Sequence, residues 1–143
     1  MKTQGNGKYG PWALITGATA GIGRELAIQV AEKKINVVAV ARRQSRLDEL
    51  ADTLKERFGV DVRTVQADLC DPAAIERIVA ATEGLEVGLL IPNAGAEMSG
   101  SFVHSNGIEQ VRLAQLNAVA PMQLAHHYGR HMAVRGRGGI LFV

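Results

Sequence analysis

Three glycines occur at a spacing that suits the binding of a phosphate group. Gly17, Gly21 and Gly23 follow the apolar run 12–16 and lead into a helical pattern over residues 22–33. In this order they would permit a sharp turn off a strand, the approach of a pyrophosphate to the backbone, and close helix–strand packing. The helix that follows would offer N–H groups and the positive end of its dipole. The pattern predicts a dinucleotide site, and a simple tight turn is the alternative.

Two arginines follow the second apolar run, residues 36–41. A site for NAD usually has Asp or Glu here, where the carboxylate binds the ribose 2′-hydroxyl. This sequence has Ala41 instead, followed by Arg42 and Arg43. No carboxylate would repel a 2′-phosphate, and a guanidinium offers it a fork of donors. The pair predicts a preference for NADP(H), carried by Arg42 with Arg43 in support, and a solvated turn is the alternative.

The elements that must position these residues alternate along the chain. Apolar or alternating runs predict five strands, over residues 12–16, 36–41, 61–66, 87–91 and 139–143. Apolar residues at helical spacing predict four helices, over residues 22–33, 45–58, from 71 onward and about 107–134. The stripes expected to be buried on the first and fourth helices are Ile22, Leu26, Ala27 and Val30, and Ile108, Val111, Leu116, Val119, Met122 and Leu124. This alternation predicts one α/β domain with a parallel sheet.

Several residues suit the ends of these helices. Ser45 is the expected N-cap of the second helix, and Gly59 is the glycine expected just after it. Asp71 and Pro72 suit the cap and the first position of the third helix. Pro121 lies inside the long fourth helix and predicts a kink there.

The run Thr16-Gly17-Ala18-Thr19-Ala20-Gly21-Ile22-Gly23 resembles the T-G-x-x-x-G-x-G fingerprint of the short-chain dehydrogenase/reductase family. The resemblance extends from about Tyr9 to Val143. It implies an NAD(P)-dependent oxidoreductase with a Rossmann-type fold of three αβα layers and strand order 3-2-1-4-5. We expect this fold to be truncated after the fifth strand in this chain. The cofactor contacts that it implies in this loop are Gly17, Thr19, Ala20, Gly21, Ile22 and Gly23. Many NADP-dependent relatives carry a basic residue in place of Ala20. The spacing argues against a methyltransferase, which would usually have a tighter glycine turn.

Two further segments match the cofactor groove of that family. Asp68 and Leu69 follow the third strand and resemble its aspartate-containing adenine contact, although a loop Asp can also cap the next helix. The segment Asn93-Ala94-Gly95 ends the fourth strand and matches the family's Asn-Asn-Ala-Gly turn except at its first position. Pro92 stands there and has no backbone N–H to donate.

The chemistry of the family is hydride transfer between nicotinamide and a carbonyl or alcohol, assisted by a serine, a tyrosine and a lysine four residues after the tyrosine. No Tyr-x-x-x-Lys occurs in this sequence, so the resemblance places these three residues beyond residue 143. Asn117 lies midway along the fourth helix, where Asn is disfavoured. The resemblance implies a catalytic role for it, because the family has an Asn here that bends the helix and holds a water in a proton relay. A polar helix face is the alternative.

Composition narrows the function classes. The 143 residues are 47% hydrophobic and 21% charged, which suits a single globular domain. The net charge of +2 is too small to indicate a nucleic-acid partner, and no apolar run approaches the ~20 residues of a membrane span. Cys70 is the one cysteine and the polar start lacks the apolar core of a secretory signal, so we expect a cytoplasmic protein. His127 and His131 lack the glutamate and third ligand of a zinc motif, so no metal site is expected.

Together these features predict that residues 1–143 are the NADP-binding domain, incomplete at its C-terminal end, of an NADP(H)-dependent oxidoreductase. Its substrate would be a small-molecule carbonyl or alcohol, and the 143-residue chain alone would be inactive. The run Tyr9-Gly10-Pro11-Trp12 is similar to the hydroxysteroid and 3-oxoacyl reductase branch of the family. Two alternatives stay open: a non-catalytic NADP-binding module and a protein-interaction module. The long fourth helix is the expected face for a homo-oligomer.

Overall fold

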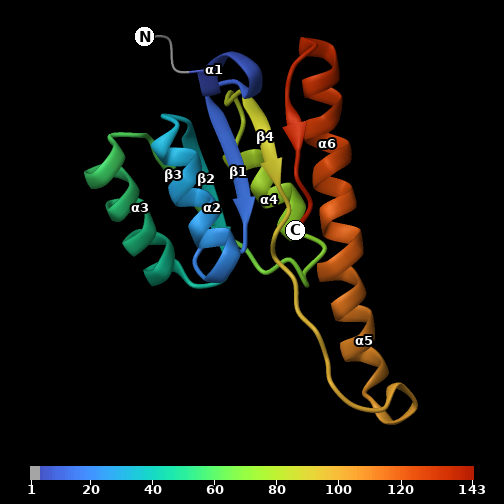
Figure 1. Ribbon diagram of the computed structural model, residues 1–143. Helices are drawn as coiled ribbons and strands as arrows, with labels where there is room; N and C mark the ends of the chain where they lie inside the picture. Colours follow the sequence, from blue (N-terminus) through green and yellow to red (C-terminus); the bar gives the residue numbers. More distant parts are fainter. Residues whose placement is uncertain (1–3) are drawn as a thin grey trace.

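The computed structural model describes residues 4–143, which form a parallel sheet covered by helices (Figure 1). The strands are β1 (Trp12–Thr16), β2 (Asn36–Ala41), β3 (Val62–Gln66), β4 (Val87–Ile91) and β5 (Gly139–Ile140). Their order in the sheet is β3-β2-β1-β4-β5, and every neighbouring pair is parallel. The predicted fold class and strand order are confirmed.

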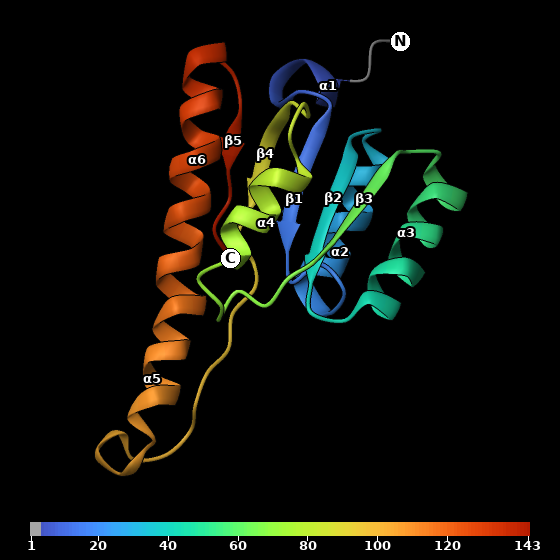
Figure 2. The ribbon, with the colours of Figure 1, turned by 180° about the vertical axis from the view of Figure 1, so that it is seen from behind.

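Successive side chains of the central strands enter two separate cores. Ala13 and Ile15 of β1 pack on one side with residues of α2 (Gly21–Glu32) and α3 (Gln44–Phe58). Leu14 packs on the other side with residues of α4 (Ala74–Ala81) and α6 (Ala120–Arg135). Figures 1 and 2 show the two layers from opposite sides, with α2 in front of the sheet in Figure 1 and α4 in front of it in Figure 2. Because both of their faces are covered, the central strands β1, β2 and β4 are apolar at nearly every position.

The remaining elements flank this sandwich. The short helix α1 (Gln4–Tyr9) precedes β1 and was not expected from the sequence. Between β4 and α6 lie η1 (Phe102–His104), α5 (Gly107–Ala114) and the π-helical turn η2 (Gln115–Val119). In both figures α5 and the loop before it extend beyond the end of the sheet.

The irregular turn of the long helix lies just before Pro121, the residue at which the kink is predicted. The departure from α-helical geometry lies in η2, where the N–H of Ala120 donates to the carbonyl of Gln115, five residues earlier. Pro121 occupies the first turn of α6 instead. The π turn inserts one additional residue into the helix directly before the proline.

Two predicted helix starts are wrong. Ser45 is not an N-cap, because α3 begins one residue before it with Arg43 at the cap position and no side-chain cap. The helix α4 begins at Ala74 rather than at Asp71. The Asp71 carboxylate instead accepts a hydrogen bond from the N–H of Ala73 at 3.0 Å, which closes a turn before the helix. Gly59 has the expected left-handed backbone, with φ of +64°, at the end of α3.

The fifth strand is shorter than its apolar run, although the ladder continues past it. Hydrogen bonds join the N–H of Leu141 to the carbonyl of Leu90 at 2.9 Å and the N–H of Val143 to that of Pro92 at 3.2 Å. Regular strand pairing is confined to residues 139–140, but the extended chain follows β4 to residue 143.

The expected apolar stripes are only partly buried. Leu124 of α6 is fully buried, as predicted. Ile22 is 63% exposed on the first turn of α2, and Ile108, Val111 and Met122 are also exposed. Periodicity identifies an apolar face of a helix but not the surface that covers it.

Candidate functional site

A cavity of about 370 Å³ opens at the carboxyl ends of β1, β2 and β4. The strand order reverses direction between β1 and β4, and ligands of open α/β sheets bind at such a switch point. The residues from the predicted cofactor set that line it are Gly17, Thr19, Ala20, Gly21, Arg42, Arg43, Asp68, Leu69, Asn93, Ala94 and Gly95. Only Ile22 and Gly23 of that set do not line the cavity, so the sequence motifs converge on one site.

The wall also contains residues that the sequence patterns did not predict as site residues. Cys70, Ala96 and Leu116 contribute to the lining. Each lies within two residues of a predicted site residue. Their closeness in sequence to a predicted site residue is the one signal that could have identified them, because none of the three belongs to a motif for cofactor binding.

The glycine loop is shaped by two different constraints. Gly21 has a φ of +52°, and a Cβ placed on it would meet nothing within 4 Å, so its backbone faces open space. A Cβ on Gly23 would overlap the carbonyl oxygen of Gly17 and the side-chain amide of Asn93. Gly23 therefore permits the close packing expected of the third glycine, while Gly21 leaves room for a ligand beside the backbone.

The first turn of α2 has the electrostatic character of an anion site. Ala20 is its N-cap residue and has no side-chain oxygen to accept a hydrogen bond from the first turn. The first turn contains no acidic residue. The positive end of the helix dipole is thus left for a ligand rather than neutralised within the chain.

A set of hydrogen bonds joins the glycine loop to the turn after β4. The hydroxyl oxygen of Thr16 accepts from the backbone N–H groups of Asn93 and Ala94, each at 3.0 Å. The side-chain amide of Asn93 donates to the carbonyls of Thr16 at 3.1 Å and Gly17 at 3.3 Å. Asn93 is therefore a structural tie between two walls of the cavity.

The end of β2 supplies the positive charge of the site. Arg42 and Arg43 are exposed and line the cavity, and Ala41 precedes them. Among the residues that the structure describes, neither guanidinium lies in an ion pair. Asp68 is the one acidic residue in the described wall. An anionic ligand would thus meet two arginines at one end of the cavity.

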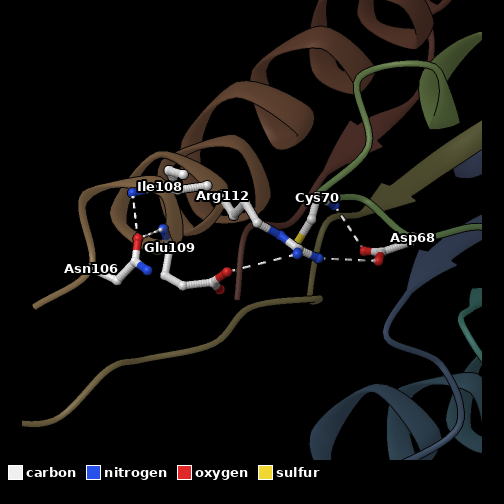
Figure 3. A network of polar contacts seen from close by, with 6 residues as sticks. All are labelled: Asp68, Cys70, Asn106, Ile108, Glu109 and Arg112. Atoms are coloured by element: carbon white, nitrogen blue, oxygen red, sulfur yellow. Dashed lines mark hydrogen bonds and ion pairs between the residues drawn. The ribbon is translucent and has the colours of Figure 1, made fainter.

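Asp68 takes part in a polar network beside the cavity (Figure 3). Its Oδ1 accepts a hydrogen bond from the N–H of Cys70 at 3.0 Å, and its Oδ2 lies 3.8 Å from a guanidinium nitrogen of Arg112. Burial, together with the Asp68 carboxylate, raises the pKa of the Cys70 thiol, so the thiol stays protonated at neutral pH. Asp68 does not cap α4, which was the alternative to the adenine contact.

Asn117 lies in the π turn η2, outside the lining of the cavity. Its Oδ1 accepts from the N–H of Ala96 at 3.0 Å, and its Nδ2 donates to the carbonyl of Ala96 at 2.7 Å. The side chain therefore holds the loop that continues from Gly95.

His127 and His131 of α6 lie elsewhere, beside a second cavity of about 540 Å³ between α4 and α6. Burial, followed by the nearby charges of His131 and Arg130, lowers the pKa of His127. Within the part of the chain that the structure describes, no three His, Cys, Asp or Glu side chains gather to hold a metal ion.

Comparison with known proteins identifies the family. The model of the short chain dehydrogenase family matches residues 11–143. The chain belongs to the short-chain dehydrogenase family. The family uses nicotinamide cofactors, in agreement with the position and composition of the cavity.

Two curated members of the family are similar over nearly the whole chain. The 7beta-hydroxysteroid dehydrogenase of Collinsella aerofaciens is 36% identical over 136 residues, which are 95% of this chain and 52% of that protein. The very-long-chain 3-oxoacyl-CoA reductase of Neurospora crassa is 36% identical over 140 residues, or 94% of this chain and 42% of that protein. The chain spans about half the length of the curated relatives it matches.

A solved structure of the family supports the comparison. The short-chain dehydrogenase from Sphingobium yanoikuyae, in complex with NADPH, superposes with a TM-score of 0.87 at 38% identity. The match covers 92% of this chain and 52% of that one.

None of the helices described here combines the length and the hydrophobicity that crossing a membrane requires.

Proposed function

We propose that this chain binds NADP(H) in the cavity at the carboxyl ends of β1, β2 and β4. The observation that carries the proposal is the pair Arg42 and Arg43, which line the cavity directly after Ala41. A guanidinium binds a 2′-phosphate through charge-assisted hydrogen bonds, and no acidic residue at the end of β2 opposes it. The NADPH complex of the Sphingobium yanoikuyae relative supports the same cofactor.

Different residues of the cavity bind different parts of the cofactor. The backbone from Gly17 to Gly23 and the first turn of α2 bind the diphosphate, because Gly21 leaves open space there. The Asp68 carboxylate accepts a hydrogen bond from the adenine amino group, with Leu69 beside the ring. The segment Asn93–Gly95 lies along the cofactor toward its nicotinamide end.

We propose further that the whole protein is an NADP(H)-dependent oxidoreductase acting on a carbonyl or alcohol. When bound, the cofactor supplies or accepts a hydride. The expected Ser, Tyr and Lys lie outside the 143 residues, since the sequence contains no Tyr-x-x-x-Lys. Asn117 contributes by supporting the water of a proton relay through the π turn in which it lies.

The relatives favour a bulky, largely apolar substrate for the whole protein. Their names specify a hydroxysteroid and a very-long-chain 3-oxoacyl-CoA. The run Tyr9-Gly10-Pro11-Trp12 supports the same branch. We also propose a cytoplasmic location, because the single cysteine of the 143 residues cannot form an internal disulfide, which suits a reducing compartment.

Titration calorimetry of the 143-residue chain with NADPH and with NADH tests the proposal. We expect NADPH to bind more tightly than NADH, because NADH lacks the 2′-phosphate. Equal affinities would contradict the NADP(H) assignment, and the absence of binding to either would contradict a nucleotide site. The same chain is expected to reduce no carbonyl compound when NADPH is supplied, and turnover would contradict the assignment of the catalytic residues.

A second candidate function rests on the exposed apolar side chains between β4 and α6. Phe102, Val103, Ile108 and Val111 are all at least 70% exposed, on η1 and α5. Exposed apolar groups in such number indicate a surface for another protein chain. We propose that this surface forms the contact of a homo-oligomer. Light scattering after size-exclusion chromatography tests this by comparing the molar mass of the chain with that of its Ile108→Asp and Val111→Asp variants.

A further inference from the structure

The side chain of Arg112 reaches the cofactor cavity from outside. Arg112 lies on α5, and one of its guanidinium nitrogens is 3.8 Å from Oδ2 of Asp68, which follows β3. Figure 3 shows the two side chains extending toward one another. Arg112 does not line the cavity, whereas Asp68 does. The arginine therefore contacts a residue of the cavity wall from a helix outside that wall.

The two oxygens of Asp68 have different partners. Oδ1 accepts from the N–H of Cys70, which fixes the carboxylate relative to its own turn. Oδ2 faces Arg112. Each carboxylate oxygen has two lone-pair sites, so both contacts leave acceptor capacity for an adenine amino group. The orientation of that remaining capacity depends on the two partners.

Arg112 is itself held in place from the start of α5. A second guanidinium nitrogen lies 3.8 Å from the carboxylate of Glu109. The first turn that carries Glu109 is capped by Asn106, whose side-chain oxygen accepts from the N–H groups of Ile108 at 2.9 Å and Glu109 at 3.4 Å. A continuous set of polar contacts thus connects the cap of α5 with Asp68 (Figure 3).

We propose that Arg112 is a positioning residue for the adenine end of the cofactor. It holds the Asp68 carboxylate in the orientation that accepts from the adenine amino group, without touching the nucleotide. This inference rests on the proposed function, because it assumes that the cavity binds NADP(H). The ion pair is about half exposed, so its effect on affinity is modest, about two- to fivefold.

The test separates the two halves of the cofactor. Binding of NADPH, of adenosine 2′,5′-bisphosphate and of reduced nicotinamide mononucleotide is measured by calorimetry for the wild-type chain and for Arg112→Met. We expect about two- to fivefold weaker binding of NADPH and of the adenosine compound, with nicotinamide mononucleotide unchanged. Arg112→Lys keeps the charge and is expected to restore most of the affinity.

Two further variants distinguish positioning from a general effect of lost charge. Arg46 pairs with Glu49 at 3.5 Å on the exposed surface of α3, so Arg46→Met removes an equally exposed ion pair and is expected to leave all three affinities unchanged. In an Asp68→Asn background, Arg112→Met should add nothing, because the carboxylate that it orients is gone.

Several results would overturn the inference. These are unchanged or tighter binding of the adenosine compound by Arg112→Met, equal weakening of both halves, or a full additional loss in the Asp68→Asn background. If the wild-type chain binds neither NADPH nor the adenosine compound, the proposed function fails instead.

Discussion

The side-chain amide of Asn117 forms a two-point hydrogen bond with the backbone of Ala96, donating to its carbonyl at 2.7 Å and accepting from its N–H at 3.0 Å. The contact joins the π turn of the long helix to the loop that leaves β4. Because both the oxygen and the nitrogen of the amide bind Ala96, which lines the cavity, the side chain holds the loop at this end of the cavity in place.

Replacing Asn117 by Ala should therefore loosen this loop. Both hydrogen bonds are lost, and since the site is exposed we expect the free energy of unfolding to fall by about 1 kcal/mol. Urea denaturation measures the change, and Gln123→Ala, at an exposed position of α6, serves as the control. Identical midpoints for the Asn117 and Gln123 variants would show that these two hydrogen bonds contribute nothing.

Replacing Arg42 by Ala should weaken the binding of NADPH by about 10- to 100-fold, because a charge-assisted hydrogen bond contributes about 1.5–3 kcal/mol. The affinity for NADH should change little, since it has no 2′-phosphate. Calorimetry with both nucleotides checks the result. Comparable losses for the two nucleotides would contradict the role of Arg42, and Arg43→Ala should have the smaller effect of a supporting residue.

Replacing Gly23 by Ala should destabilise the fold by about 1–3 kcal/mol. Its Cβ would overlap the carbonyl of Gly17 and the amide of Asn93, of which the first is backbone and cannot rotate away. Thermal unfolding followed by circular dichroism measures the cost. Gly107 is also in the first turn of a helix, but a Cβ there meets nothing within 4 Å, so Gly107→Ala should be neutral or slightly stabilising. Equal melting temperatures of the two variants would argue against close packing at Gly23.

Acidification should destabilise the protein in part through His127. Its folded-state pKa is lowered by burial, so the stability that it contributes is present above about pH 6.5 and is lost as the pH falls through the folded pKa. His127→Gln should therefore show a smaller drop in melting temperature between pH 7.5 and pH 5 than the wild type. Tyr128→Phe is the control on the same helix, because burial raises the pKa of Tyr128 and the residue does not titrate in this interval. A drop as large in His127→Gln as in the wild type would exclude this contribution.

Much of the fold follows from local patterns. The alternation of apolar runs with helical stripes predicts the elements, and the glycine loop with its family resemblance predicts the strand order and the cavity. The predictions that are wrong concern the first residues of helices, which depend on contacts between elements as well as on local sequence. Ser45 has the right side chain for a cap, but α3 starts at Gln44, with Arg43 at the cap position. Asp71 makes a local hydrogen bond that a sequence cannot distinguish from a helix cap.

For the site, the sequence predicts which residues line the cavity but not which contacts they make. The sequence predicts that Asn93 and Asp68 belong to the cavity, and both line it. It does not predict that Asn93 ties the glycine loop to β4, or that Asp68 meets an arginine from a helix about 40 residues further on. Such contacts depend on distances between elements, for which one sequence offers no periodic signal.

The π turn at Gln115–Val119 determines where α5 directs its side chains. One residue more than a regular turn requires is equivalent to a rotation of about 100° and a shift of about 1.5 Å between the helical segments on either side. The segment after the turn packs Leu124, Tyr128 and Met132 into the core, which fixes its orientation. If the helix were regular throughout, Arg112 would lie about a quarter of the way around the axis from Asp68. A single-residue deletion within the turn would thus separate the guanidinium from the carboxylate while the sheet and its core stayed intact.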